Sequence, residues 1–79
     1  SKREATDDKD DAITARVHEH MEKDAHLKKA GIHAQTNAGV VSLSGEVQDL
    51  TTSAEASSSA WQVPGVKAVK NDLTVKEKA

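Results

Sequence analysis

Apolar and polar residues alternate along residues 37–47, which read NAGVVSLSGEV. Such a period of two is typical of a β-strand that is buried on one side. The apolar face carries Val41, Leu43, Gly45 and Val47, and the polar face carries Ser42, Ser44 and Glu46. The pattern therefore predicts a strand whose apolar face is covered by the rest of the chain.

A turn signal comes directly before this strand. Asn37, Ala38 and Gly39 tolerate the positive φ that a tight hairpin needs. Residues 32–36 alternate in the same way, and we expect them to form a first strand that pairs antiparallel with the second. Gly45 leaves a gap in the second strand's apolar face, which predicts a bulge or a helix backbone passing close by.

Helical spacing appears before the hairpin. The apolar residues Ile13, Val17 and Met21 recur at i, i+4 and i+8, which predicts a helix over residues 11–23 with Asp8 or Asp10 as its N-cap. The polar residues 1–9 are expected to be a disordered leader, with the domain spanning 10–77. Residues 25–31 are expected to be a connector in which Leu27 packs inward.

A second helix is predicted over residues 53–62, after the hairpin. Ala56, Ala60 and Val63 share its packing face, and Thr52 and Glu55 have the spacing of a capping box. Pro64 and Gly65 end this helix.

A last strand is predicted over residues 66–76, with Val69, Leu73 and Val75 on one face and Asn71 in the gap between them. The order of elements is therefore helix, strand, strand, helix, strand. We expect an α+β fold, a single αββαβ two-layer sandwich in which two helices pack on one face of a three-stranded sheet. The position of the last strand in the sheet stays open.

Composition excludes several classes of function. With 79 residues and Trp61 as its one aromatic, the chain has room for one domain with a thin aliphatic core. A net charge of −2 argues against a nucleic-acid binder. Without cysteine there is no disulfide, thiolate nucleophile or Cys-based zinc site. No signal-peptide core is present, and since the chain begins with Ser1 we expect a mature or excised segment.

Three stretches together resemble the BON domain family. They are DDAITARV at residues 10–17, NAGVVSLSGEV at 37–47, and the pattern AxxxAxxVPGVxxVxNxLxV at 56–75. The resemblance covers roughly residues 10–76 and implies the αββαβ fold. It also implies a bacterial periplasmic or outer-envelope location, association with osmotic stress, and weak binding to phospholipid membrane surfaces without catalysis. By resemblance, the expected partner is an anionic phospholipid surface or an envelope protein.

Catalytic and metal chemistry find little support in the sequence. The serines lie on a strand's outer face or within a helix, and no GxSxG elbow surrounds them, so we expect no enzymatic activity. On a helix His18 and His20 point about 200° apart, and His18 with Glu22 lacks a further ligand pair. We expect surface histidines, no metal site and no cofactor.

A binding surface is a better-supported hypothesis. Lys28, Lys29, Lys67 and Lys70 form either a patch for anionic headgroups or an ordinary charged rim. Trp61, with Leu50, either inserts at a membrane interface or docks a partner, unless Trp61 lies flat and caps the core. Gly39, Gly45 and Gly65 are interpreted as structural turn glycines.

The alternative function is a protein-interaction or chaperone-like accessory domain of the periplasm. It would use the exposed edge of the sheet, where unpaired backbone groups accept an added strand. We expect a monomer in either case.

Overall fold

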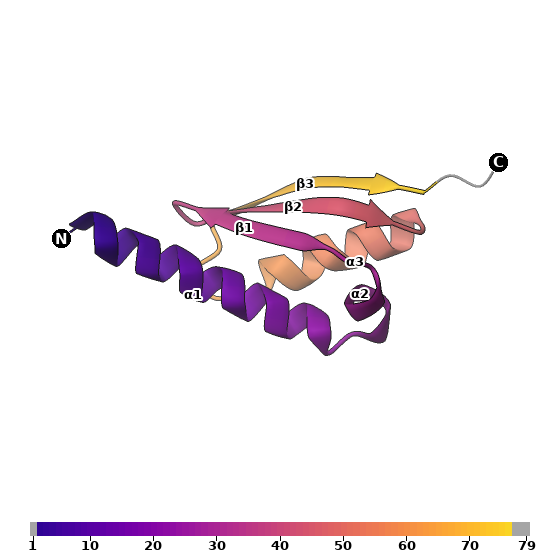
Figure 1. Ribbon diagram of the computed structural model, residues 1–79, viewed down its shortest axis with the longest axis horizontal. Coiled ribbons are helices and arrows are strands. Elements are labelled where there is room, and N and C mark those ends of the chain that lie inside the picture. The colour runs from indigo at the N-terminus through magenta and orange to yellow at the C-terminus, as the bar shows by residue number, and fades with distance from the viewer. Residues whose placement is uncertain (1, 77–79) are drawn as a thin grey trace.

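The structure is a computed structural model, which describes the backbone of residues 2–76 and the side chains of residues 9–76. Its elements are α1 (Lys2–Glu22), α2 (Ala25–Lys29), β1 (His33–Asn37), β2 (Val40–Val47), α3 (Leu50–Trp61) and β3 (Ala68–Val75). The sheet has the order β1-β2-β3, with β1 antiparallel and β3 parallel to the central strand β2. Figure 1 shows the helices beneath the sheet, whose upper face is uncovered. The expected α+β two-layer architecture is confirmed, with α2 as an additional short helix.

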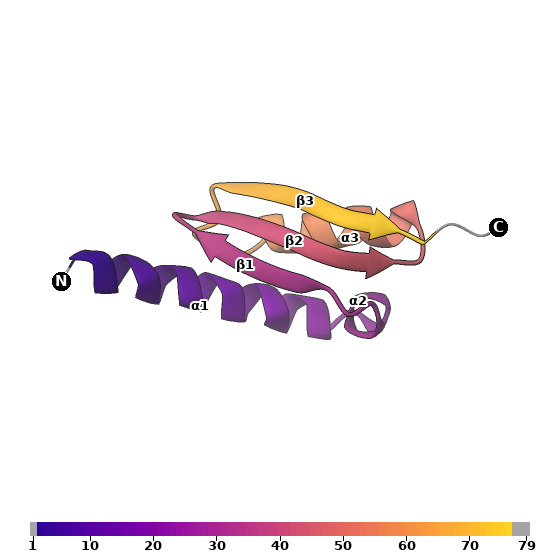
Figure 2. The ribbon, with the colours of Figure 1, turned by 45° about the horizontal axis from the view of Figure 1, so that its top comes forward.

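The N-terminal helix begins earlier than expected. It starts at Lys2 and so includes residues 2–9, the segment predicted to be a disordered leader. This segment contains neither glycine nor proline, and its Lys, Arg, Glu and Ala residues are good helix formers. Figure 2 shows α1 extending past the hairpin end of the sheet.

Asp10 has a different role from the predicted N-cap. It lies inside α1, as does Asp8, so neither residue caps the helix. The Asp10 carboxylate instead accepts hydrogen bonds from the backbone N–H of Ala38 (2.9 Å) and Gly39 (3.2 Å) in the hairpin turn. This carboxylate therefore ties the first helix to a turn 28 residues away in sequence.

The predicted connector contains the five-residue helix α2. Asp24 is its N-cap, and its Oδ1 accepts a hydrogen bond of 2.9 Å from the backbone N–H of His26. Leu27 is buried, as predicted. A helix this short has too few residues to show an apolar periodicity of its own.

The core forms from the apolar residues that the two periodicities identify. Leu43, Val17, Val41 and Val47 are its largest fully buried side chains. The other buried apolar residues are Ile13, Met21, Leu27, Ile32, Ala56, Ala60 and Val63. Val69, Leu73 and Val75 of β3 are only partly buried, because β3 lies at the edge of the sheet.

Gly45 accommodates a close backbone approach, although the neighbour is not a helix. A Cβ at this position would lie 3.0 Å from the carbonyl oxygen of Gly31, in the segment that leads into β1. Pairing of β2 with β3 runs through Gly45 without interruption. The prediction of a bulge or a helix backbone is therefore wrong. The space left by the missing side chain of Gly45 is occupied by the backbone at Gly31, between α2 and β1.

Asp49, and not Thr52, caps α3. Its Oδ1 accepts hydrogen bonds from the backbone N–H of Thr52 (2.8 Å) and from Thr52 Oγ1 (2.7 Å). The helix therefore begins at Leu50, three residues before the predicted start. The capping box predicted for Thr52 and Glu55 is wrong, because Thr52 lies within the first turn.

These two hydrogen bonds from Thr52 hold the pKa of Asp49 below its ordinary value of 3.8. A carboxyl whose pKa is depressed on folding stabilises the fold above its unfolded pKa, and this contribution is lost as pH falls through the folded pKa. We therefore expect the first turn of α3 to weaken only below pH 3.8. A carboxyl ¹³C NMR titration should give Asp49 a midpoint below this value, and a midpoint at or above it would contradict the capping geometry.

Asn71 fills the gap in the apolar face of β3. Its amide nitrogen donates to Ser57 Oγ (2.6 Å), Ser53 Oγ (3.1 Å) and the Ser53 carbonyl (3.2 Å) of α3. Its Oδ1 accepts from the backbone N–H of Leu73 (3.0 Å). Some of the serines in α3, which are poor helix formers, thus hold β3 against the helix.

Candidate binding surface

The outward side of α3 carries two large apolar side chains. Leu50 is 76% exposed and Trp61 is 54% exposed, at the first and last positions of the helix. Eleven residues make about three helical turns, so the two side chains leave the same side of α3 roughly 16 Å apart. Ala54 and Ser58 are exposed between them, so this side of the helix carries no charge.

The four predicted lysines do not gather into one patch. Lys28 and Lys29 are exposed on α2, at one end of the sheet. Lys67 is at the opposite end, where its backbone N–H donates to the carbonyl of Gly39 in the hairpin (2.8 Å). Lys70 lies on the uncovered face of the sheet, with Nζ 3.8 Å from a carboxylate oxygen of Asp72. The predicted lysine rim is therefore divided among three places.

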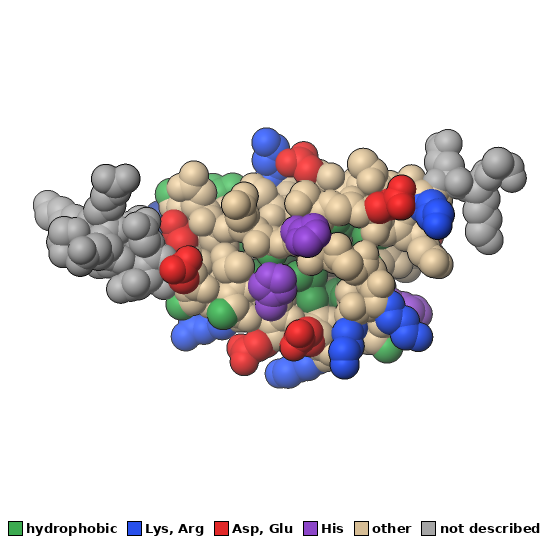
Figure 3. Space-filling view, viewed as in Figure 1, with side chains coloured by type: hydrophobic (Ala, Val, Ile, Leu, Met, Phe, Trp, Pro, Cys, Tyr) green, Lys and Arg blue, Asp and Glu red, His purple; other side chains and the backbone are tan. Residues whose placement is uncertain are grey.

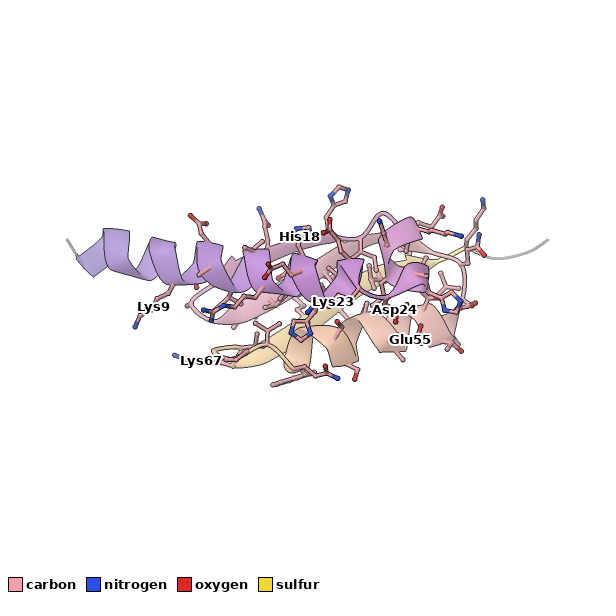
Figure 4. The ribbon with its side chains drawn as sticks, turned by 90° about the horizontal axis from the view of Figure 1, so that it is seen from below. Lys9, His18, Lys23, Asp24, Glu55 and Lys67 are labelled. Atoms are coloured by element: carbon pink, nitrogen blue, oxygen red, sulfur yellow. The ribbon has the colours of Figure 1, made fainter. Side chains whose placement is uncertain are left out.

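Sequence reasoning missed a cationic groove at the hairpin end of the molecule. This open groove has a volume of about 680 Å³ and is lined by Lys9 and Arg16 of α1 and by Lys67, which outnumber the one acidic residue there, Asp10. Figure 4 shows Lys9 and Lys67 at the same end, away from Asp24. Ile13 and Pro64 also line the groove and make part of its surface apolar. Lys9 and Arg16 are seven residues apart, on one side of a helix, but only the fold places the chain around Pro64 beside them.

Charge is otherwise mixed over the molecule. On the face seen in Figure 3, acidic and basic side chains alternate along the lower edge, and apolar side chains show only in small patches. Within residues 2–76, no helix has the length and apolar character to cross a membrane. Gly39, Gly45 and Gly65 all have positive φ, but Gly45 lies within strand β2 and not in a turn.

A family model described as BON domain matches residues 9–77 of the chain. The match covers all three helices in part or whole, every strand and all of the predicted contact residues. A comparison with curated proteins finds no significant match. BON domains occur in bacterial periplasmic and envelope proteins and are generally non-catalytic.

Proposed function

Because the chain belongs to the BON domain family, we propose that it is a non-catalytic envelope module that binds weakly to anionic phospholipid surfaces. The observation that carries this proposal is the position of Leu50 and Trp61, exposed on one side of α3. Tryptophan and leucine are the side chains that amphipathic helices insert at the boundary between headgroups and acyl chains.

The geometry of α3 suits a helix that lies flat on a surface. Leu50 and Trp61 leave the helix in nearly the same direction, so both reach a plane parallel to the helix axis. The exposed residues between them, Ala54 and Ser58, are small and uncharged. The helix backbone can therefore approach the headgroups without desolvating a charge.

Two lysines line hollows beside α3, in company with the acidic residues Asp24, Asp49 and Glu55. Lys29 lines a hollow together with Thr51 at the start of the helix, and Lys23 lines another with Ser58 and Gln62 near its end. Each lysine near an anionic membrane contributes about 1 kcal/mol. Since the chain carries a net charge of −2, the attraction is weak and sensitive to salt.

Vesicle sedimentation tests the proposed surface. We expect the protein to sediment with phosphatidylglycerol vesicles at low salt, to show a blue shift of Trp61 emission, and to lose both in high salt or with neutral phosphatidylcholine vesicles. Replacing Leu50 and Trp61 together with serine should lower vesicle affinity by about tenfold or more, because two exposed apolar side chains lose their burial. Unchanged affinity in this double variant would contradict the assignment to α3.

A matched pair of lysine variants separates a specific surface from general charge attraction. Lys29→Gln should lower vesicle affinity about fivefold, since it removes a charge beside α3. Lys70→Gln makes the same charge change on the opposite face of the sheet and should have little effect. Equal losses in the two variants would show that no particular face meets the membrane.

The alternative of strand addition at the sheet edge has less support. β3 is an edge strand of eight residues, but Asn71 Oδ1 already accepts the backbone N–H of Leu73 at that edge. Lys70 and Asp72 add charges along the strand. Charged and internally satisfied edges are common devices against pairing with another chain.

A further inference from the structure

Three side chains with metal-ligand chemistry converge between α2 and α3. Asp24 is the N-cap of α2, His26 is in its first turn, and Glu55 is in α3. One nitrogen or oxygen atom from each lies within 4.8 Å of those of the other two. Figure 4 shows Asp24 and Glu55 close together where the end of α1 approaches α3.

The Glu55 carboxylate has an unsatisfied oxygen at this point. Its Oε1 is buried and has no hydrogen-bond partner among the described residues. His26 Nδ1 lies 3.7 Å from this oxygen, which is too long for a hydrogen bond. The Glu55 side chain as a whole is 39% exposed, but this one oxygen is shielded from solvent without a donor, and a cation between Glu55 and His26 would satisfy it.

We propose that Asp24, His26 and Glu55 form a binding site for a divalent first-row transition-metal ion such as Zn²⁺. Zinc bonds of about 2.0–2.2 Å place the ligand atoms of a tetrahedral site roughly 3.4 Å apart. Movements of about 1 Å, within the reach of side-chain rotation, therefore close the site around an ion. Water completes the coordination, since His26 is on the surface with 77% of its side chain exposed.

The donor set selects the class of ion. One imidazole nitrogen with two carboxylate oxygens suits Zn²⁺, Ni²⁺ or Co²⁺ better than Ca²⁺ or Mg²⁺, which prefer oxygen alone. The two carboxylates balance the charge of a divalent ion. Asp24 is already oriented, because its Oδ1 accepts the backbone N–H of His26 at 2.9 Å.

Two arrangements compete with the metal. In the first, Lys23, which lines a hollow together with Asp24 and Glu55, offers its ammonium group to the two carboxylates. A protonated His26 forms an ion pair with Glu55 in the other arrangement. If either ion pair is the only role of these residues, the protein has no Zn²⁺ affinity that is lost when His26 or Glu55 is replaced. Such a loss therefore distinguishes the proposed metal site from both ion pairs.

A titration of the full chain with zinc sulfate, followed by NMR, tests the proposal. We expect one equivalent of Zn²⁺ to saturate the protein, with shifts at the His26 ring nitrogens and at the amides around Asp24 and Glu55. A bound ion joins α2 to α3, so the melting temperature should rise with Zn²⁺ concentration. The absence of saturable binding up to millimolar Zn²⁺ would overturn the site.

Variants assign the ligands. His26→Ala and Glu55→Gln should each lower Zn²⁺ affinity about tenfold or more while leaving the metal-free spectrum folded. His18→Ala is the matched control, because His18 is an exposed helical histidine with Glu22 four residues further along, yet it lies outside the cluster. Wild-type affinity in Glu55→Gln, or an equal loss in His18→Ala, would overturn the proposal.

Discussion

Replacing Leu43 with alanine is expected to lower the free energy of unfolding by about 3 kcal/mol. Leu43 is fully buried on the central strand, and its cross-strand neighbours are Ala34 on β1 and Asn71 on β3. Neither neighbour is large enough to fill the cavity that truncation leaves. For a domain whose total stability is roughly 5 kcal/mol, this loss removes most of it.

Urea denaturation followed by far-ultraviolet circular dichroism measures this effect without relying on the half-exposed Trp61. Ser44→Ala is the matched control, since Ser44 is the next residue of β2 and is exposed on the uncovered face. That variant should change stability by no more than about 0.5 kcal/mol. A loss below 1 kcal/mol for Leu43→Ala would mean that the small residues around it repack.

Gly45→Ala is expected to destabilise the domain by at least about 2 kcal/mol. The residue has φ +123°, where side chains other than hydrogen are strained, and the new Cβ would lie 3.0 Å from the carbonyl oxygen of Gly31. Relief of this contact has to move the backbone that leads into β1, because the obstructing atom is not the end of a flexible side chain.

Gly31→Ala is a reference for positive φ without a steric contact, at a φ that residues other than glycine adopt at lower cost than +123°. Gly31 also has positive φ, at +66°, but a Cβ there would have no neighbour within 4 Å. Replacing Gly31 with alanine should lower the free energy of unfolding by about 1 kcal/mol, which is the cost of placing a residue with a Cβ at positive φ. Chemical denaturation gives the free energy of unfolding of both variants and shows which substitution costs more. If Gly31→Ala lowered it as much as Gly45→Ala, backbone strain, and not the contact with Gly31, would account for the requirement for glycine at position 45.

Much of the fold could be predicted because the apolar residues of its core recur at regular spacings along the sequence. The alternation in residues 37–47 and the four-residue spacing of Ile13, Val17 and Met21 identify buried positions directly. Roles that depend on a distant partner could not be found in this way. Asp10 has the sequence context of a helix cap, and only the fold brings its carboxylate to the amides of the hairpin turn.

The candidate surface was predicted less well, for two physical reasons. A helix predicted over residues 53–62 leaves Leu50 outside it, and the common side of Leu50 and Trp61 follows only from the start of α3 at Leu50, with Asp49 as its cap. Residue type alone predicts one group of lysines, whereas the path of the chain through the fold determines where each lysine lies. Lys29 and Lys67 lie at opposite ends of the sheet because β1 and β2 together return the chain to the end where it started, and α3 then carries it to the hairpin end.

The central strand also implies an order of folding events. Val40 pairs with Asn37 across a two-residue turn, but with Ala68 only after 28 residues. Closing the longer loop costs about 2 kcal/mol more in chain entropy, so the hairpin forms early and β3 docks late. The late step requires α3 to be helical, and its serines make that helix weak in isolation. We therefore expect the rate of folding to depend more on the serine-rich crossover helix α3 than on the hairpin.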